Sequence, residues 1–384
     1  MSLSPDTLTT ISRLQYVATR LKSSFARRDT AVDLVILALV SREHLLFLGP
    51  QGTAKSDLVE RFAHAIQCET FHYLLTHFTD TAELCGAHHG LLPHPDRTRT
   101  RTDGFLPSAR IVLLDDVFQI NSLMINSLIT LLQNRVFHNG FERLTVPLIS
   151  LFATSRHLPD DLSLRGFSDR FLLRLRLEPV QDAALGELLS KGWALEMGAS
   201  TPTAPEPSLA PEDLDNLYRA LPDVAIAEIA ALYQGLLRHL RAEGIDLSDR
   251  RIVKGLKLIR AAALLDGRDE ATPRDLWPLT HVWSTPEEAV ALRDVIQPLI
   301  EEAGGPVLEA RRPLEDLREE LALLVAYAPN LRGEEMFTAH LTALGQLRRD
   351  VIFHAPRSND LLTRLEAEIE RILTVMEHQF FHNR

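Results

Sequence analysis

The sequence predicts an α/β fold in which a parallel sheet carries helices on both faces and is followed by a region built only of helices. Short apolar runs with strand character alternate with stretches of helical spacing up to about residue 177. This alternation is typical of a parallel sheet, because its crossover connections are helices. A Gly-rich turn joins the first strand to the next helix. Beyond residue 181 the strand pattern disappears, and amphipathic helices continue to the C-terminus.

Composition and charge fit a globular protein with two or three domains. The 384 residues are 45% hydrophobic and carry a net charge of −11, which argues against a protein that binds nucleic acid over its whole surface. Only two cysteines occur, Cys68 and Cys85, so a disulfide framework is not expected and a reducing compartment fits. The first residues do not show a basic stretch followed by an apolar stretch, and no later segment is apolar for long enough to span a bilayer. We therefore expect a cytoplasmic protein without a membrane span.

The elements of the first half follow one another in a regular order. Residues 8–40 have apolar side chains at helical spacing and lead into an apolar strand at 44–48. After the Gly-rich turn we expect a helix to Gln67, strands at 71–78 and 111–114, a helix at 123–133, a hairpin through Asn139 and Gly140, and strands at 147–154 and 171–177.

The second half reads as helices separated by breaks. A Pro- and Ser-rich segment at 199–213 is expected to be a loop, because it is too rich in helix breakers to pack as a helix. The expected helices cover 224–243, 249–265 and 273–281, and helical spacing continues from 286. We divide the chain into an α/β core with an N-terminal helix at 1–180, a helical lid at 181–285 and a C-terminal helical domain at 286–384.

The Gly-rich turn has the pattern of a phosphate-binding loop. Its backbone N–H groups would form a concave nest for phosphate oxygens, Lys55 would supply a point charge, and Ser56 would hold Mg²⁺. Ala54 departs from the usual Gly before the Lys, which is a modest loss if this residue has helical dihedral angles. Ordinary turn chemistry is the alternative explanation. The predicted nucleotide-binding residues here are Gly49, Pro50, Gln51, Gly52, Thr53, Ala54, Lys55, Ser56 and Asp57.

A second acidic site is expected at the end of the strand at 111–114. Asp115 would hold Mg²⁺ together with Ser56, and Asp116 would polarise the attacking water. A strand that simply ends in an Asp-rich turn is the alternative.

These motifs, with four others, resemble the MoxR group of AAA+ ATPases, and within it the regulatory ATPase variant called RavA. The motifs are G-P-Q-G-T-A-K-S, I-V-L-L-D-D, L-I-T-L-L-Q-N-R, L-F-A-T-S-R, F-S-D-R-F and S-D-R-R, and the resemblance covers about residues 10–285. It implies an AAA+ αβα P-loop core with an all-α lid, which binds ATP and Mg²⁺. It also implies a homo-oligomer, as a hexameric ring, and a chaperone-like remodeller that works with a von Willebrand factor A domain partner.

Two arginines take roles from the same resemblance. Arg170 matches the arginine finger, which would reach the γ-phosphate bound by the neighbouring subunit and stabilise the transition state. Arg250 matches the lid arginine that senses nucleotide, although Arg251 is adjacent and can take that role. The alternatives are an ion pair between Arg170 and Asp169, and solvated arginines at the start of a helix.

Two departures from the family pattern bear on hydrolysis. Asp116 replaces a Glu, which shortens the reach of the carboxylate by about 1.5 Å, and Arg156 replaces a polar Asn at the end of the fourth core strand. A shift of about 1 Å at a reacting centre costs on the order of 10²-fold in rate. Catalytic roles are assigned to Asp116, Arg156 and Arg170, with ATP binding better supported than turnover. A nucleotide-gated scaffold is therefore the second candidate function.

Two weaker patterns lie between 85 and 102. Cys85, His88, His89 and His94 are close in sequence but match no zinc spacing. The basic run from Arg97 to Arg101 would grip an acidic peptide or a nucleic-acid backbone if it lined a pore, and it is otherwise a solvated loop. A nucleic-acid motor is the third candidate function. It is the least supported of the three, because we expect no nucleic-acid partner.

Overall fold

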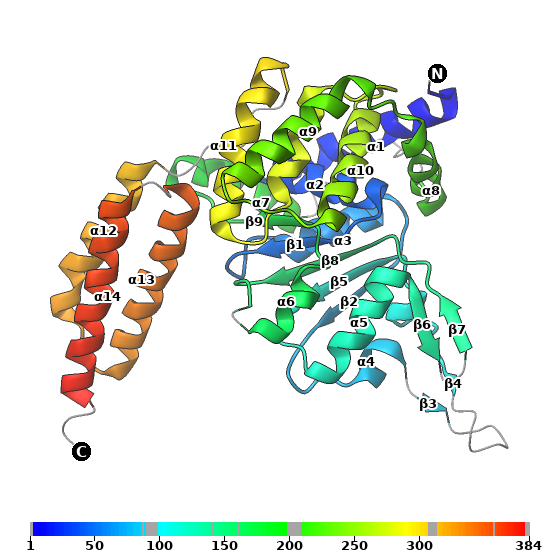
Figure 1. Cartoon of the computed structure of the whole chain (residues 1–384). Coiled ribbons are helices and arrows are strands. Elements are labelled where there is room, and N and C mark those ends of the chain that lie inside the picture. The colour runs from blue at the N-terminus through cyan, green and yellow to red at the C-terminus, as the bar shows by residue number, and fades with distance from the viewer. Residues whose placement is uncertain are drawn as a thin grey trace.

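The computed structural model of the chain describes residues 3–86, 88–89, 99–139, 142–159, 161–197, 209–305, 313–355 and 358–380. Its architecture confirms the predicted α/β core followed by helices (Figure 1). None of the helices in these ranges combines the length and the apolar character needed to cross a membrane.

A five-stranded parallel sheet forms the centre of the first half. Its strands are β1 (Leu45–Leu48), β2 (Thr70–Leu74), β5 (Ile111–Asp115), β8 (Ser150–Ser155) and β9 (Leu173–Arg176), in the order β2-β5-β8-β1-β9. Every pairing in the sheet is parallel. The side chains of β1, and nearly all of those of β5 and β8, are buried, as expected of strands covered on both faces. The segments that follow β1, β5 and β8 therefore meet at one edge of the sheet.

Two helices precede the sheet where the sequence has helical spacing. The first is α1 (Pro5–Ser24), capped by the Ser4 hydroxyl, and the second is α2 (Asp29–Ser41). The helix α2 packs against α1, against the two strands β1 and β9, and against α10 (Asp249–Leu265) of the second half. Most of its side chains are buried, because a helix that is apolar on all sides is stable only inside a core.

The remaining elements of the first half surround the sheet. They are α3 (Lys55–Ala65), α4 (Thr81–Cys85), η1 (Leu106–Ser108), α5 (Ser122–Asn134) and α6 (Leu162–Ser168), with the short strands β3 (His88–His89), β4 (Arg99–Thr100), β6 (Val136–Asn139) and β7 (Glu142–Thr145). The strands β6 and β7 pair antiparallel, as the predicted hairpin requires, while Gly140 lies outside the described residues. The strand predicted at 71–78 ends at Leu74, because Thr76 and Thr79 hydrogen-bond to each other and turn the chain.

Helices take over after β9, as predicted. They are η2 (Asp182–Ala184), α7 (Leu185–Glu196), α8 (Pro211–Ala220), η3 (Leu221–Asp223), α9 (Ala227–Ala242), α10, η4 (Pro273–His281) and α11 (Pro286–Glu302). The predicted loop at 199–213 extends too far, because α8 begins at Pro211, a residue suited to a first helical turn. Residues 198–208 of that loop lie outside the described part of the chain.

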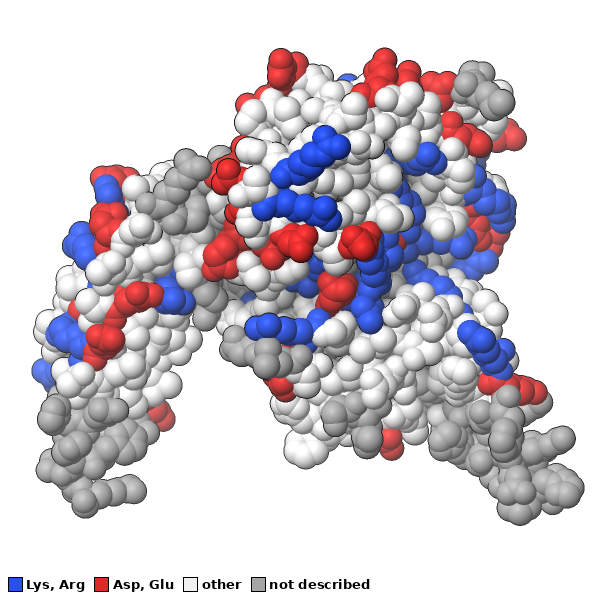
Figure 2. Space-filling model, in the orientation of Figure 1, with Lys and Arg blue, Asp and Glu red and all other residues white. Residues whose placement is uncertain are grey.

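Ion pairs join these helices to the sheet. Glu43, which is only 1% exposed, precedes β1 and pairs with Lys254 and Lys257 of α10. Arg42 pairs with Asp215 of α8. Figure 2 shows Lys and Arg side chains gathered along the boundary between the upper helices and the sheet on this face. The lid position is therefore fixed by buried and half-buried charge pairs.

The last three helices form a second, separate core. They are α12 (Leu314–Tyr327), α13 (Glu334–His354) and α14 (Asn359–Phe380), with η5 (Ala328–Asn330) between the first two, and Figure 1 shows them beside the rest of the molecule. The buried residues of α11 belong instead to the main core, although the sequence division places 286–302 with the C-terminal domain. The three-domain division itself stays a prediction.

The pair of Arg176 on β9 and Asp350 on α13 connects the two cores, and both side chains are nearly buried. We predict that Asp350→Ala lowers the free energy of unfolding by about 2 kcal/mol, because a buried guanidinium loses a charged partner. Denaturant unfolding measures this loss. The matched control is Glu366→Ala, which removes an exposed pair with Arg348 and should cost less than about 1 kcal/mol. Equal effects of the two variants would contradict the prediction.

Candidate nucleotide-binding site

The Gly-rich loop lies between β1 and α3, as predicted. Gly49 has φ +133°, and a Cβ added there would come within 2.0 Å of the Leu177 carbonyl oxygen, so only glycine fits. Gly52 has φ +80°, which also favours glycine. The backbone at Gly49 therefore lies directly against the backbone at Leu177, the residue that follows β9.

Ala54 does not have the right-handed helical dihedral angles that would make it a harmless substitute for glycine. Its φ of 60° and ψ of 30° are left-handed, and it forms the N-cap of α3. A left-handed residue with a Cβ costs roughly 1–2 kcal/mol. The expectation of a modest loss is therefore corrected: the loop holds a strained residue immediately before the predicted phosphate-binding lysine.

The ammonium group of Lys55 lies inside the loop. Its Nζ donates to the carbonyl oxygens of Gly49 and Pro50, at 3.1 and 2.6 Å, and to the Thr53 hydroxyl at 3.1 Å. The residue is 8% exposed, and this burial lowers the pKa of Lys55 below its usual 10.5. A buried cation with neutral partners favours an anion beside it.

Ser56 and Asp115 are brought together as predicted, from elements 59 residues apart in the sequence. The Ser56 hydroxyl donates to the two Asp115 carboxylate oxygens at 2.8 and 3.1 Å. A hydroxyl and a carboxylate in contact are the hard oxygen donors that Mg²⁺ takes in proteins. The residues present therefore fit this metal.

Two further side chains hold Asp115 and are not among the predicted site residues. Thr154 on β8 donates to Asp115 at 2.7 Å, and His72 on β2 lies 2.7 Å from it. The one sequence indication for each is a polar residue within a predicted core strand, and only the strand order places them beside Asp115. The other ring nitrogen of His72 lies 2.6 Å from Glu60 of α3.

The pKa values follow from these contacts. Burial raises the pKa of Asp115, but the hydrogen bonds from Thr154, His72 and Ser56 outweigh it, and the pKa lies below its usual 3.8. Burial lowers the pKa of His72, but Asp115 and Glu60 outweigh it, and the pKa lies above 6.5. Only a protonated imidazole donates from both ring nitrogens, so the two carboxylates favour the charged form.

Asp116 occupies the tight turn after β5. Its φ of 50° is left-handed, a conformation that Asp tolerates better than most residues. The Thr154 hydroxyl accepts its backbone N–H at 3.3 Å. Within the described residues the Asp116 carboxylate makes no hydrogen bond or ion pair, while its charge raises the pKa of Lys55. It is thus the uncommitted carboxylate at this edge.

Arg156 follows β8 and is exposed. It lies near enough to Lys55 to lower the pKa of that lysine. The Thr154 hydroxyl of β8, in contrast, contacts the Asp115 carboxylate and the backbone N–H of Asp116. Within the described residues, the side chain from this part of the chain that contacts Asp115 is therefore that of Thr154 and not of Arg156.

Arg170 and the two lid arginines gather around a single carboxylate, Asp169. Arg251 contacts it at 3.0 Å, Arg170 at 3.6 Å and Arg250 at 3.8 Å. Burial and the charge of Arg250 lower the pKa of Arg170, against the opposite effect of Asp169. Three cations share one anion, so the cluster keeps an excess of positive charge.

The two lid arginines differ in how they are held. Arg251 is 3% exposed and also donates to the Val282 carbonyl and the Ser284 hydroxyl. The side chain of Arg250 is 28% exposed, and it contacts Asp169 in the 3.8 Å ion pair. Arg251 therefore fastens α10 to α6, and Arg250 is the more exposed and less tightly held of the two.

The arginine cluster and the Gly-rich loop lie at opposite edges of the sheet. Arg170 comes before β9, whose first residue pairs with Leu45 at the start of β1, whereas the loop follows Leu48 at its end. Four strand residues span about 13 Å. Within one copy of the chain, the sheet therefore separates the cluster from Lys55.

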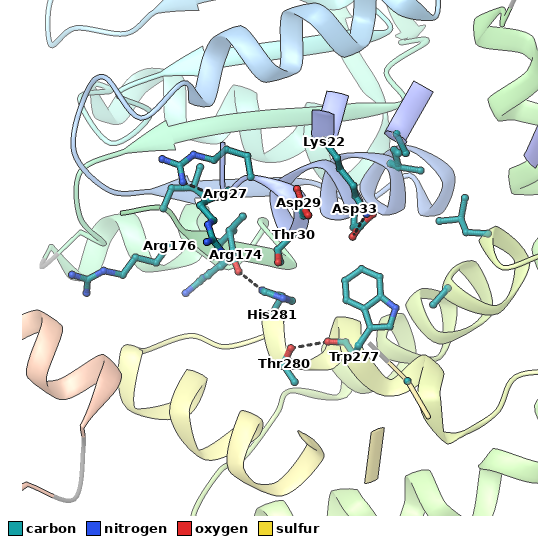
Figure 3. Close-up of a pocket in the computed structure, with 18 of the residues that line it drawn as sticks. Lys22, Arg27, Asp29, Thr30, Asp33, Arg174, Arg176, Trp277, Thr280 and His281 are labelled. Atoms are coloured by element: carbon teal, nitrogen blue, oxygen red, sulfur yellow. Dashed lines mark hydrogen bonds and ion pairs between the residues drawn. The ribbon is translucent and has the colours of Figure 1, made fainter. Parts of the chain in front are cut away.

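A cavity of about 1240 Å³ is lined by residues of α1, α2, β9 and η4. Arg28, one of its lining residues, donates to the Thr53 carbonyl at 3.2 Å and to the Glu178 carbonyl at 2.9 Å. Figure 3 shows His281 in this cavity near Thr30 and Trp277. Its Nδ1 atom lies toward the Arg174 carbonyl. The sequence motifs miss Arg28, which connects the cavity wall to the phosphate loop.

The weaker patterns fall partly outside the described residues, which exclude His94, Arg97 and Thr98. In the described part of the chain, no group of three or more His, Cys, Asp or Glu is placed to hold a metal ion. Arg101 pairs with Asp103 at 3.5 Å, with both side chains exposed.

The chain matches two family descriptions. Residues 12–219 match the MoxR domain in the MoxR-vWA-beta-propeller ternary systems, and residues 228–296 match the AAA lid domain. Two uncharacterized proteins of Methanocaldococcus jannaschii are similar. MJ0812 is 33% identical over 87% of this chain and 88% of its own length, and MJ0079 is 32% identical over 80% of each.

A solved structure also matches in fold. The structure described as a "putative ATPase" from Cytophaga hutchinsonii has a TM-score of 0.61 and 16% identity, and the match covers 77% of this chain and 96% of that one. At this identity the match shows the fold alone.

The two lid arginines should differ in their effect on stability. We predict that Arg251→Ala lowers the free energy of unfolding by about 3 kcal/mol, because it removes the contact of a buried guanidinium with Asp169 and two further hydrogen bonds. Arg250→Ala, one residue away, should cost less than about 1 kcal/mol. Denaturant unfolding of both variants checks this, and a larger loss for Arg250→Ala would reverse the assignment.

His72 should make stability depend on pH. Because its pKa is raised in the folded state, its contribution is fully present below pH 6.5 and is lost as the pH rises through the folded value. We predict that the stability difference between wild type and His72→Gln, measured with a chelator present, is largest near pH 5.5 and shrinks toward pH 8.5. Other titrating groups are common to both proteins and cancel. A difference that stays constant across this range would contradict the prediction.

Proposed function

The chain belongs to the MoxR group of AAA+ ATPases, and we propose that it binds Mg-ATP in the Gly-rich loop and uses nucleotide turnover to remodel protein complexes. The observation that carries the proposal is the convergence of Lys55, Ser56 and Asp115 at one edge of the sheet. A buried ammonium, a hydroxyl and a low-pKa carboxylate are what a metal–triphosphate needs.

Each residue of this edge has a part in the proposal. Bound Mg²⁺ would neutralise the charge that develops on the phosphates. Ser56 and Asp115 would hold it, and Thr154 would keep the Asp115 carboxylate turned toward Ser56. Lys55 would exchange its loop carbonyls for phosphate oxygens. The backbone N–H groups from Gln51 to Asp57 would form the rest of the phosphate nest.

The base and ribose are proposed to extend toward the cavity beside Arg28. The loop carbonyl of Thr53 forms part of the hydrogen-bond link to that cavity, so a nucleotide seated on the loop reaches its rim. Arg28 is a positioning residue in this proposal, since it holds the loop against the chain after β9.

We propose that the site is completed by a second copy of the chain in a ring. Arg170 and Arg250 are grouped at the sheet edge opposite to their own loop, so they would serve the nucleotide of a neighbour. Both would then stabilise charge on the γ-phosphate, where an arginine finger is worth about 10³–10⁵ in rate. The hexameric count stays a prediction.

A nucleotide-gated scaffold is the second candidate function, and Asp116 favours it. The carboxylate is one methylene shorter than a Glu, and its backbone is left-handed, so a longer acid at this position would carry strain. If the protein is an ATPase, Asp116 would polarise the attacking water. If it is a scaffold, Asp116 would only contribute negative charge beside Lys55. The exposed cation at Arg156, whose charge lowers the pKa of Lys55, would pair with phosphate in either case.

A von Willebrand factor A domain protein is the proposed partner, because the matched domain is described from systems that contain one. The finer resemblance to RavA, the chaperone role and the cytoplasmic location remain part of this proposal. No described residue favours a nucleic-acid motor.

We predict that Lys55→Ala weakens ATP binding by about 10²-fold, since charged hydrogen bonds of up to about 3 kcal/mol are lost. Isothermal titration calorimetry with Mg-ATP measures the change. The control is Arg348→Ala, which removes an exposed cation paired with Glu366 in the C-terminal helices and should bind ATP within about threefold of wild type. Unchanged affinity in Lys55→Ala would refute the nucleotide site.

The role of Asp116 is tested by turnover. Asp116→Asn keeps the size and tolerates the left-handed backbone, so we predict unchanged ATP affinity and a rate lowered by about 10²–10⁴-fold. A phosphate-release assay with saturating Mg-ATP measures the rate. A wild type that binds ATP but shows no turnover above the Asp116→Asn variant would establish the scaffold instead.

A further inference from the structure

One helix of the described chain presents a continuous apolar face to solvent. On α7, the side chains of Leu185, Leu189, Trp193 and Met197 follow one another at intervals of four, and they are 41%, 71%, 66% and 60% exposed. Leu188 beside them is 38% exposed, and α7 has no buried residue. We name Leu185, Leu188, Leu189, Trp193 and Met197 the α7 stripe. Exposed apolar patches of this kind mark interaction surfaces.

The opposite side of α7 is fixed to the segment that leads into the phosphate loop. Lys191 donates to the Phe25 and Lys22 carbonyls at 3.2 and 3.1 Å, and Glu187 pairs with Arg27 at 3.5 Å. The next residue, Arg28, donates to Thr53 within the loop. The α7 stripe is therefore held rigidly beside the nucleotide-binding edge.

The chain that follows α7 does not supply side chains to cover the stripe. Residues 198–208 contain Ala and Pro but no Leu, Ile, Val, Met or aromatic residue. Covering an i, i+4 ladder that includes Trp with an apolar partner is favourable, because it removes apolar surface from water. The occupant must therefore come from another part of the chain or from another molecule.

We propose that a second copy of the chain covers the α7 stripe, and that this copy is the one that brings Arg170 and Arg250 to the neighbouring nucleotide. The inference rests on the proposed function, because it follows from a shared site. A copy that places its arginines at Lys55 approaches the edge to which α7 is fastened. That approaching surface also carries Val253, 67% exposed and one turn beyond Arg250 on α10, so apolar side chains are available on both surfaces.

The test compares two double variants of matched exposure. Leu189→Ser with Trp193→Ser removes the centre of the stripe. Leu323→Ser with Tyr327→Ser removes an apolar pair, 66% and 50% exposed, from α12 of the C-terminal bundle. Light scattering over a concentration series with Mg-ATP gives the assembly midpoint, and calorimetry gives ATP affinity. We expect the first variant to bind ATP like wild type but to assemble at a concentration at least tenfold higher, and the second to assemble like wild type.

Trp193 also reports its own surroundings. We expect its fluorescence, taken as the difference between wild type and Trp193→Phe, to be quenched by acrylamide in dilute protein and protected when Mg-ATP drives assembly. Protection that persists at dilution would show that the chain covers its own stripe and would overturn the proposal. So would full quenching in the assembled protein, or assembly of the Leu189 and Trp193 variant at the wild-type midpoint.

The outcomes separate this inference from the proposed function. If wild type binds ATP and assembles while the stripe stays exposed, only the inference fails, and an external partner becomes the occupant. If wild type stays a monomer at every concentration of protein and Mg-ATP, the shared site fails, and the inference fails with it. Loss of ATP binding in the stripe variant, with the fold intact, would place α7 in the nucleotide site itself and overturn its role as an interface.

Discussion

The parallel direction of the five strands is the constraint on which the rest of the structure depends. Because the strands run the same way, the C-terminal ends of β1, β5 and β8 meet at one edge of the sheet. There Ser56, Asp115 and Thr154 come into contact. The same constraint places Asp169 and Arg170, which precede β9, at the other edge. The candidate metal–phosphate site and its candidate arginines are thus kept apart within one copy, and in the proposed ring they would meet between copies.

Charge balance explains how each edge is held before any ligand arrives. At the loop edge, Asp115 is held by Ser56, Thr154 and His72, and these hydrogen bonds outweigh the cost of burying its charge. At the other edge, Asp169 contacts the buried Arg251 at 3.0 Å and the more exposed Arg250 at 3.8 Å. One arginine fixes the lid to the core, while its neighbour keeps the capacity to bind an anion.

The sequence predicts the fold and the centre of the site, and misses what depends on strand order. The pairing of Ser56 with Asp115 is predicted because a local loop motif requires an acidic partner. The left-handed backbone of Ala54 and the contacts of Thr154, His72 and Arg28 are not predicted, since each joins segments distant in sequence. The exposure of the apolar side chains on α7 is also not predicted. A run with Leu and Trp at helical spacing is typical of a core helix, and only the structure shows that these side chains are exposed.

A shared site makes complementation the most direct measurement. Lys55→Ala lacks a working loop but keeps its arginines, and a variant with Arg170→Ala and Arg250→Ala keeps its loop but lacks the arginines. Each should be inactive alone, and a mixture should recover a measurable fraction of wild-type ATP turnover, because some interfaces combine an intact loop with intact arginines. Mixtures that stay as inactive as their components, although scattering shows mixed assemblies, would contradict a site divided between two copies.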